Sequence, residues 1–267
     1  MMDRRQLLDR AARNGDERVL LAHILDKCEQ SRNRNIPSAT DFLSPAEQRS
    51  AQDLLHAAAI HDGCAFCGGF ERAERRMLLF LPDWQEESDF LADPEGPVAA
   101  LEAAFPADAE LSHRDILGAL MGLGITREKL GDILLDHGRC QVLVLRDALP
   151  ILLSQWESAG RWKMKLREIP LEQLEAKPPQ VKTIRDTVAA LRLDAVLAAG
   201  FSTSRSKAAD LVSAGRVSVN HRECAKADRT VGEGDVLSCR GLGKCVVKEV
   251  LGQSKKGRFM LVLERYI

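Results

Sequence analysis

The stretch from Leu191 to Val236 carries a regular pattern of two short helices followed by a strand. Apolar residues three and four positions apart predict that each helix buries one face. These residues are Leu193, Val196 and Leu197 in the first helix and Ala208, Leu211 and Val212 in the second. The hydroxyl residues 202–204 can cap the second helix, and Gly215 can end it. Val217 and Val219 then alternate as in a β-strand.

Basic residues gather at the helix starts and in the turn after the second helix. They are Arg192, Arg205, Lys207, Arg216 and Arg222. Free backbone amides point outward at a helix N-terminus, and cations and amides on one small surface suit a run of phosphates. The alternative is an ordinary solvated face, which would not require Arg-Leu-Asp, Ser-Arg-Ser-Lys-Ala and Gly-Asp in this order. The prediction requires that these cations lie together on one face and are not occupied in internal ion pairs.

The pattern resembles the RNA-binding domain of ribosomal small-subunit protein four, called the S-four domain below. In that domain an α-hairpin packs on a small β-sheet. The matching stretch, residues 191–236, has the family's internal spacing. The resemblance implies that this end of the chain binds RNA.

Two later hairpin turns also combine glycine with cations. Their cations are Arg240 and Lys244 in the first turn and Lys255, Lys256 and Arg258 in the second. Glycine lets the backbone approach a ligand closely, and the cations supply charge there. For the second turn, an ordinary polar hairpin is an equally good interpretation without the family resemblance.

The net charge of −1 hides an asymmetry along the chain. From Val181 to the end there are 16 Lys and Arg against 9 Asp and Glu, whereas the preceding residues hold 22 against 30. A basic C-terminal module behind an acidic body indicates that only one end is drawn to a polyanion by bulk charge. The acidic body could still contact RNA through local patches.

Composition predicts a cytoplasmic protein without membrane segments. No stretch approaches the ~20 apolar residues of a membrane span, and the N-terminus leads into a charged helix instead of a signal core. Seven scattered cysteines indicate reduced thiols. The metal-like group is Cys64 and Cys67 with His61 and His56. A structural zinc site normally needs two well-spaced pairs, so we expect no metal and no cofactor.

The length of 267 residues suits two or three domains, and we expect an α+β fold. Residues 1–75 are predicted to be a helical N-terminal segment, with Ser44 capping a helix that starts at Pro45. Residues 76–170 are predicted to be a ferredoxin-like or RRM-like domain, and residues 182–267 an S-four-like domain, joined by a linker at 171–181.

The middle domain is predicted from its element order, βαββαβ. The expected strands are 98–105, 132–135, 140–145 and 162–169, and the expected helices are 112–122 and 146–158. The acidic residues 83–97 before it are predicted to form a surface loop. RNA-recognition modules of this fold carry aromatic residues on the sheet, and this segment lacks the usual pair. RNA contact by this domain therefore does not follow from fold alone.

Three further blocks extend the resemblance over almost the whole chain. They are residues 68–76 (GGFERAERR), residues 113–125 (HRDILGALMGLGI) and residues 127–133 (REKLGDI). With these blocks, the chain resembles the YlmH family of RNA-binding, ribosome-associated quality control proteins. The resemblance implies a protein that binds ribosomal RNA and tRNA on a large ribosomal subunit obstructed by peptidyl-tRNA. It also implies a role beside the tailing factor RqcH, during addition of C-terminal alanine tails.

The resemblance also implies which residues contact RNA. Those that match the family's RNA-binding hairpin and its adjoining turn and strand are Arg192, Ser204, Arg205, Lys207, Arg216, Asn220 and Arg222. Arg205 is the first choice among them. The His113-Arg114-Asp115 block matches the family's central region, and its likeness to a kinase triplet is dismissed, because no glycine-rich phosphate loop accompanies it.

Two other classes of function fit the sequence less well. An RNA-modifying enzyme would need a catalytic aspartate in its own context or a glycine-rich loop for a methyl donor, and neither pattern is present. A cell-division or membrane-associated adaptor would be supported by an amphipathic anchor or a lipidation signal, and the sequence offers neither. We therefore expect a monomeric, non-catalytic RNA-binding protein.

Overall fold

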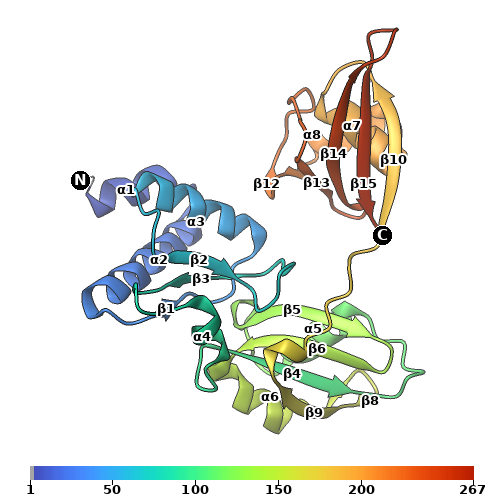
Figure 1. Ribbon diagram of the computed structural model, residues 1–267. Coiled ribbons are helices and arrows are strands. Elements are labelled where there is room, and N and C mark those ends of the chain that lie inside the picture. The colour runs from blue at the N-terminus through green and yellow to red at the C-terminus, as the bar shows by residue number, and fades with distance from the viewer. Residues whose placement is uncertain (1–2) are drawn as a thin grey trace. The chain divides into compact units, whose positions relative to one another are not determined.

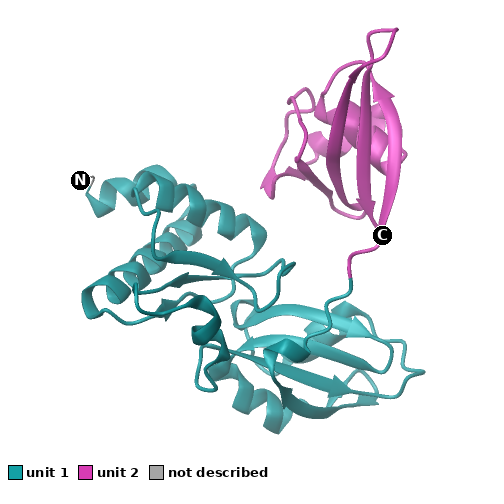
Figure 2. Cartoon of the chain, viewed as in Figure 1, with its two compact units in different colours: residues 1–177 teal, residues 178–267 magenta. Residues whose placement is uncertain are grey.

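The computed structural model describes residues 3–267, which form an α+β protein (Figure 1). The chain divides into two compact units, the first ending at Lys177 and the second beginning at Pro178 (Figure 2). Met1 and Met2, where the predicted helical segment begins, lie outside the described residues. Among residues 3–267, no helix is both long enough and apolar enough to cross a membrane.

The first unit begins with helices around a small sheet. Its elements are α1 (Arg4–Ala11), α2 (Gly15–Arg34), β1 (Ser38–Ala39), α3 (Pro45–Ala57), β2 (Cys64–Cys67), β3 (Met77–Phe80) and α4 (Glu87–Ala92). Helices α1, α2 and α3 bury one apolar core, which includes Leu21, Ile24 and Leu54. The three strands form an antiparallel sheet in the order β1-β3-β2.

The helix start at Ser44 is confirmed in detail. The Ser44 hydroxyl accepts a hydrogen bond from the Glu47 amide at 3.4 Å, and the Ser44 amide donates to the Glu47 carboxylate at 2.6 Å. Pro45 occupies the first helical position, where its missing N–H costs nothing. Ser44 and Pro45 therefore predicted this boundary from local chemistry alone, and the structure adds the reciprocal bond from Glu47.

The three-stranded sheet of β1, β3 and β2 was not predicted. One of its strands, β3, therefore belongs to the N-terminal region and not to the middle domain. Residues 77–80 were expected to open the middle domain, but β3 pairs with β1 and β2 instead. Strands of two to four residues are too short to show a period of two, and their partners are distant in sequence. Similarly, α4 interrupts the loop expected at 83–97, with Glu87 and Asp89 in its first turn, where carboxylates favour a helix.

The middle of the chain forms a four-stranded antiparallel sheet in the order β5-β6-β4-β9. The elements are β4 (Val98–Ala104), α5 (His113–Gly122), η1 (Arg127–Lys129), β5 (Leu130–Asp136), β6 (Arg139–Leu145), η2 (Arg146–Ala148), α6 (Leu149–Gln155), β7 (Ser158–Ala159), β8 (Trp162–Lys163), β9 (Lys165–Ile169) and η3 (Leu171–Gln173). This connectivity and order are those of a split βαβ unit. The last strand is interrupted at Met164, so β8 pairs only with β7.

Arg75 joins the N-terminal region to the middle sheet inside the first unit. Its guanidinium is buried and donates hydrogen bonds to the carbonyls of Phe42 at 2.7 Å, Leu130 at 2.8 Å and Arg127 at 3.1 Å. The amides of Glu74 and Arg75 donate to the Asp132 carboxylate at 2.6 and 3.0 Å. Residues 68–76 and 127–133, two blocks that carried the family resemblance, therefore meet at this junction.

The second unit is a six-stranded antiparallel sheet with two helices packed on it. Its elements are β10 (Val181–Val188), α7 (Leu193–Phe201), α8 (Arg205–Ser213), β11 (Val217–Val219), β12 (Arg222–Glu223), β13 (Val236–Cys239), β14 (Gly243–Gln253) and β15 (Phe259–Tyr266), and the sheet order is β10-β15-β14-β13-β11-β12. Strand β10 was missed in the sequence because its residues are mostly polar; pairing with β15 along its whole length defines it.

Helices α7 and α8 form the predicted hairpin and bury the predicted faces. Leu193, Val196 and Leu197 are buried in one core with Val212 and with strands β14 and β15. Gly200 allows close approach, because a β-carbon there would lie 2.7 Å from the sulfur of Cys245. This contact fixes how deeply α7 sits on the sheet.

Arg75 yields a direct test of the junction. Arg75→Met removes hydrogen bonds to three carbonyls. The Phe42 carbonyl loses its side-chain donor, whereas the Leu130 carbonyl still accepts from Arg127 Nη1 and the Arg127 carbonyl from the Leu130 amide, so we expect a loss of roughly 1–3 kcal/mol in the free energy of unfolding. All three tryptophans, at 84, 156 and 162, lie in the first unit, so urea unfolding followed by tryptophan fluorescence reports on that unit. Arg72→Met, an exposed change in the same loop, should alter stability by less than about 0.5 kcal/mol. Equal effects of the two changes would contradict the assignment.

Candidate RNA-binding surface

The α7–α8 hairpin brings Arg192 and Arg205 together on one carboxylate. Arg192 donates from Nε and Nη2 to the two oxygens of Asp194 at 3.2 and 3.1 Å, and Arg205 donates to the same oxygens at 3.1 and 3.4 Å. Arg192 lies just before α7 and Arg205 begins α8, so Asp194 also ties the two helix starts. Sequence reasoning placed the cations but missed the role of Asp194.

The carboxylate is inside and the guanidinium groups are outside. The side chain of Asp194 is 6% exposed, against 40% for Arg192 and 55% for Arg205. Burial alone would raise the pKa of Asp194, but the hydrogen bonds and positive charges of the two arginines outweigh burial and lower that pKa. The carboxylate is therefore ionised at neutral pH, and the group of three side chains carries a net charge of +1.

These ion pairs were not expected, since the prediction required cations free of internal partners. Asp194 holds both arginines in place but occupies only some of their N–H donors. A guanidinium has five N–H donors, and each of these arginines spends two of them on Asp194. Three donors on each side chain stay available for phosphate oxygens. Pairing also fixes the two side chains, which lowers the entropy lost when a ligand binds.

Lys207 adds an exposed ammonium one turn into α8. Ser204, which is also predicted to contact RNA, caps this helix: its hydroxyl accepts a hydrogen bond from the Lys207 amide at 3.2 Å. Arg205, Lys207 and the first amides of α8 thus share one end of the hairpin.

Arg216 and Arg240 form a second group beside the hairpin. The guanidinium of Arg216 donates to the Arg240 carbonyl at 2.9 Å, and both side chains are exposed. Arg222 lies on β12, and the ammonium of Lys244 stacks 4.1 Å from the ring centre of Tyr266. Each of these cations occupies a defined place on the small sheet or its turns.

Asn220 shapes a turn with its side chain. Its amide nitrogen donates to the Asp235 carboxylate at 2.8 Å, and its amide oxygen accepts from the Val236 backbone at 2.9 Å. Asn220 has a φ of +51°, in the left-handed region that asparagine tolerates. Asp235 also accepts from the Gly232 amide at 2.8 Å, so its carboxylate links the β11–β12 turn at Asn220 to the turn that precedes β13.

The last hairpin turn carries Lys255, Lys256 and Arg258. Both lysines are exposed, whereas Arg258 donates from Nε to the Thr187 hydroxyl at 3.0 Å and from Nη2 to the Thr187 carbonyl. Arg258 and Arg205 line one open groove between β10 and α7, of about 500 Å³, together with the hydroxyl residues Ser202 and Thr203. Two groups of cations that are distant in sequence are thereby brought to one surface.

Within the His113-Arg114-Asp115 block, Asp115 has a structural role. Asp115 accepts from the Ser112 amide at 2.8 Å, and its own amide donates to the Ser112 hydroxyl at 3.3 Å, so it caps α5. Cys64 and Cys67 stand at the two ends of β2, and burial raises the pKa of Cys67 to about 11. Among residues 3–267, no three His, Cys, Asp or Glu side chains gather in a metal-binding arrangement.

Comparison with known proteins finds separate matches for the middle region and for the second unit. Residues 98–173 match the family model described as a putative RNA-binding domain in YlmH, and residues 191–237 match the S4 domain. Over 254 residues the chain is 35% identical to ribosome-associated protein quality control protein P2 of Bacillus subtilis (strain 168). This match covers 94% of the chain and 95% of that protein. A solved structure, cell division protein ylmH from Streptococcus pneumoniae, is 25% identical with a TM-score of 0.47, and covers 61% of this chain and 98% of that one.

Asp194 gives a test of the arginine pair. Asp194→Asn removes charged hydrogen bonds that hold both guanidinium groups, so we expect a loss of roughly 1.5–3 kcal/mol at pH 7. Because the folded-state pKa of Asp194 is lowered, its contribution is present above its unfolded pKa and is lost as the pH falls through the folded value. Calorimetric Tm values from pH 7 to pH 3 should therefore fall less steeply for this variant.

Asp210→Asn, which neutralises an exposed carboxylate of α8, is the matched control. Its Tm at pH 7 should stay close to that of the unaltered protein. If Asp194→Asn matches this control at every pH, Asp194 does not organise the hairpin.

Proposed function

The chain belongs to the YlmH family of RNA-binding proteins, and from this premise we propose that it is a non-catalytic factor of the large ribosomal subunit. In this proposal it binds ribosomal RNA and tRNA on subunits obstructed by peptidyl-tRNA. The support is the RNA-binding domain match at each end of the region 98–237 and the 35% identity to a quality control protein. That relative's name describes it as ribosome-associated.

The observation that carries the proposal is the geometry of the α7–α8 hairpin. Arg192 and Arg205 share the buried Asp194, and Lys207 lies one helical turn away from the cap at Ser204. Fixed guanidinium forks suit the bidentate recognition of phosphate. The basic second unit, with 16 Lys and Arg against 9 Asp and Glu from Val181 onward, supplies long-range attraction to RNA.

The predicted contact residues fall into two roles in this proposal. Those that contact RNA through charged groups are Arg192, Arg205, Lys207, Arg216, Arg222, Arg240, Lys244, Lys255, Lys256 and Arg258. Ser204 and Asn220 act indirectly, because their side chains hold the backbone of the helix start and of the turn. The groove that joins Arg205 to Arg258 gives the RNA backbone a continuous path across the domain.

We further propose that the protein acts in the cytoplasm as a monomer beside an RqcH-type factor, during addition of C-terminal alanine tails to stalled chains. The middle sheet, with the connectivity of an RRM-like plait, would provide a second contact to RNA. Support for this contact is its match to the putative RNA-binding domain of the family. No reaction chemistry is assigned to the chain in this proposal.

The hairpin is tested by Arg205→Ala combined with Lys207→Ala. Arg192 still pairs with Asp194 in this variant, so the fold should be retained. Co-sedimentation with large ribosomal subunits should weaken, because two phosphate contacts are lost. The slope of log affinity against log salt should flatten by roughly 1.4–1.8.

Lys182→Ala combined with Arg185→Ala removes the same charge from β10 of the same unit and is the matched control. It should bind large subunits nearly as the unaltered protein does. Equal affinity and equal salt slope for the two double variants would rule out the hairpin as the site of contact.

A further inference from the structure

The four-stranded sheet of the middle region has one face covered by its own helices. Leu101, Val142 and Val144 are fully buried on that face, in a core with α5 and α6. Residues at alternate positions, such as Leu143, point to the opposite, outer face. RNA-recognition modules with this connectivity bind RNA on the outer face of the sheet.

Much of this outer face is occupied by the chain itself. At one end, Val98, Leu143 and Leu145 pack against Phe42 and Met77 of the N-terminal region. These residues are buried, and a β-carbon at Gly131 of β5 would lie 2.9 Å from the ring of Phe42. RNA bases therefore have no access to this end of the sheet.

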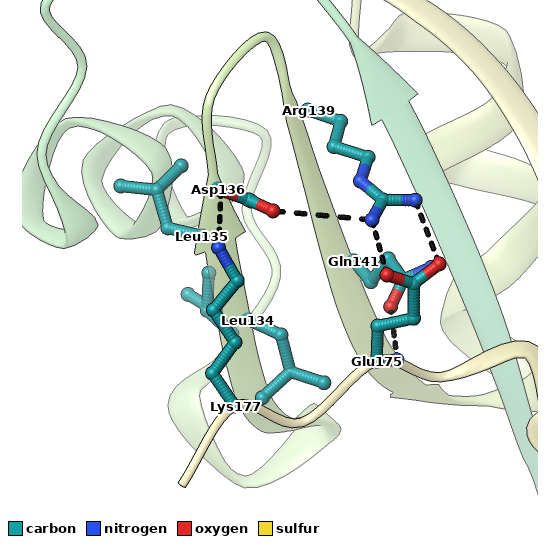
Figure 3. A pocket seen from close by; sticks show the side chains of 8 residues that line it. Leu134, Leu135, Asp136, Arg139, Gln141, Glu175 and Lys177 are labelled. Carbon is teal, nitrogen blue, oxygen red and sulfur yellow. Dashed lines mark hydrogen bonds and ion pairs between the residues drawn. The ribbon is translucent and has the colours of Figure 1, made fainter. Parts of the chain in front are cut away.

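The polar centre of the outer face is covered by the segment 173–177, which runs across β5 and β6. The buried side chain of Gln141 donates to the Gln173 carbonyl at 3.0 Å and accepts from the Glu175 amide at 2.8 Å. Arg139 pairs with Glu175, and Lys177 pairs with Asp136 at 2.7 Å. Figure 3 shows the guanidinium of Arg139 between the carboxylates of Asp136 and Glu175, with Gln141 beside Glu175.

A basic rim stays open at the other edge of the same sheet. It comprises Arg161 in the β7–β8 turn, Lys163 on β8 and Lys165 on β9, all of them exposed. Met164 and Leu166 alternate with the lysines and face the helix-side core, so the lysines point away from it. Within residues 3–267, none of the three cations forms an ion pair with a carboxylate.

The unpaired positive charges of this rim differ from the other cations of residues 98–173. Residues 98–173 contain 9 Lys and Arg against 11 Asp and Glu, and four of the nine cations lie between 161 and 167. The fourth, Arg167, is held by Glu102 at 2.6 Å. Elsewhere in the region, Lys129, Arg139 and Arg146 are likewise paired with carboxylates. The rim is thus a local positive patch on a domain of net negative charge.

The guanidinium of Arg161 is also pre-positioned. It lies 4.7 Å from the ring centre of Trp162, a cation–π distance. A stacked guanidinium keeps its N–H edge available for phosphate and loses less freedom on binding.

A plainer explanation is that lysines protect an edge strand from pairing with another chain. This explanation fits Lys165, because β9 is an edge of the sheet. It does not account for Arg161 and Lys163, which lie outside the four-stranded sheet.

We propose that the β8–β9 rim, formed by Arg161, Lys163 and Lys165, is the RNA-contact surface of the middle region and binds backbone phosphates in place of the covered sheet face. The proposal deepens the proposed function and rests on it. Its ligand is the sugar-phosphate backbone of folded RNA, which needs exposed cations and no open aromatic platform.

The test uses the full chain and purified large ribosomal subunits. Arg161→Gln, Lys163→Gln and Lys165→Gln are combined in one variant. We expect at least a roughly tenfold loss of affinity and a salt slope flatter by roughly 2–3. A charge-preserving variant, with Arg161→Lys, Lys163→Arg and Lys165→Arg, should restore most of the affinity.

A second control removes the same charge elsewhere in the first unit, at the exposed residues Arg10, Arg13 and Arg34, each changed to Gln. It should bind as the unaltered protein does. Far-ultraviolet circular dichroism establishes that all three variants are folded. Equal losses in the rim variant and in this control would reduce the effect to bulk charge and overturn the proposal.

Lysine acetylation read by mass spectrometry separates the two surfaces. Bound large subunits should protect Lys163 and Lys165 together with Lys207, and nuclease digestion of the RNA should abolish the protection. Protection of Lys207 alone would overturn the rim while leaving the hairpin intact. Protection of none of these lysines would overturn both proposals. Protection of the rim that survives nuclease digestion would assign it to a protein partner, and would also overturn the proposal.

Discussion

The buried carboxylate of Asp194 is the interaction on which the candidate surface depends. It draws Arg192 and Arg205 onto one side of the α7–α8 hairpin and leaves their remaining donors facing solvent. Without an anion between them, two guanidinium groups would repel each other and be free to move apart. One buried negative charge thus organises a surface of net positive charge. The ion pairs are internal, yet they are compatible with the binding hypothesis, because they orient the two arginines while neutralising only one of their two positive charges.

A buried charged side chain also organises the first unit, but there it is a cation. Buried Arg75 is held by three carbonyls instead of a carboxylate, and it joins the N-terminal region to the middle sheet. This junction places Phe42 and Met77 over the outer face of the sheet. The segment 173–177 covers the polar centre of that face through Gln141 and Glu175. The basic rim at β8–β9 lies beside the uncovered edge of this sheet, and the phosphate contact proposed for it would need no aromatic residues on the sheet face.

The sequence predicted those features that depend on residues close together in the chain. The caps at Ser44 and Ser204 and the apolar faces of α7 and α8 follow from short-range spacing, and the structure confirms them. Residues 77–80 were expected to be a strand and form β3, but strands β1 and β10 could not be predicted, because their identity comes from partners distant in sequence. For the site, the cations were identified but their bonding was not: the roles of Asp194, of Asn220 and of Thr187 beneath Arg258 appear only when the chain is folded. Sequence patterns specify which charges are present, and tertiary structure decides which of them stay available.

The central claim is that the hairpin organised by Asp194 docks onto ribosomal RNA. Its most direct test is a cryo-electron microscopy structure of the full chain bound to the large ribosomal subunit. The account predicts RNA phosphate oxygens within hydrogen-bond distance of Arg205 and Lys207, while Asp194 still bridges Arg192 and Arg205. A bound protein whose α7–α8 hairpin faces solvent, with the RNA held by another surface, would contradict the account.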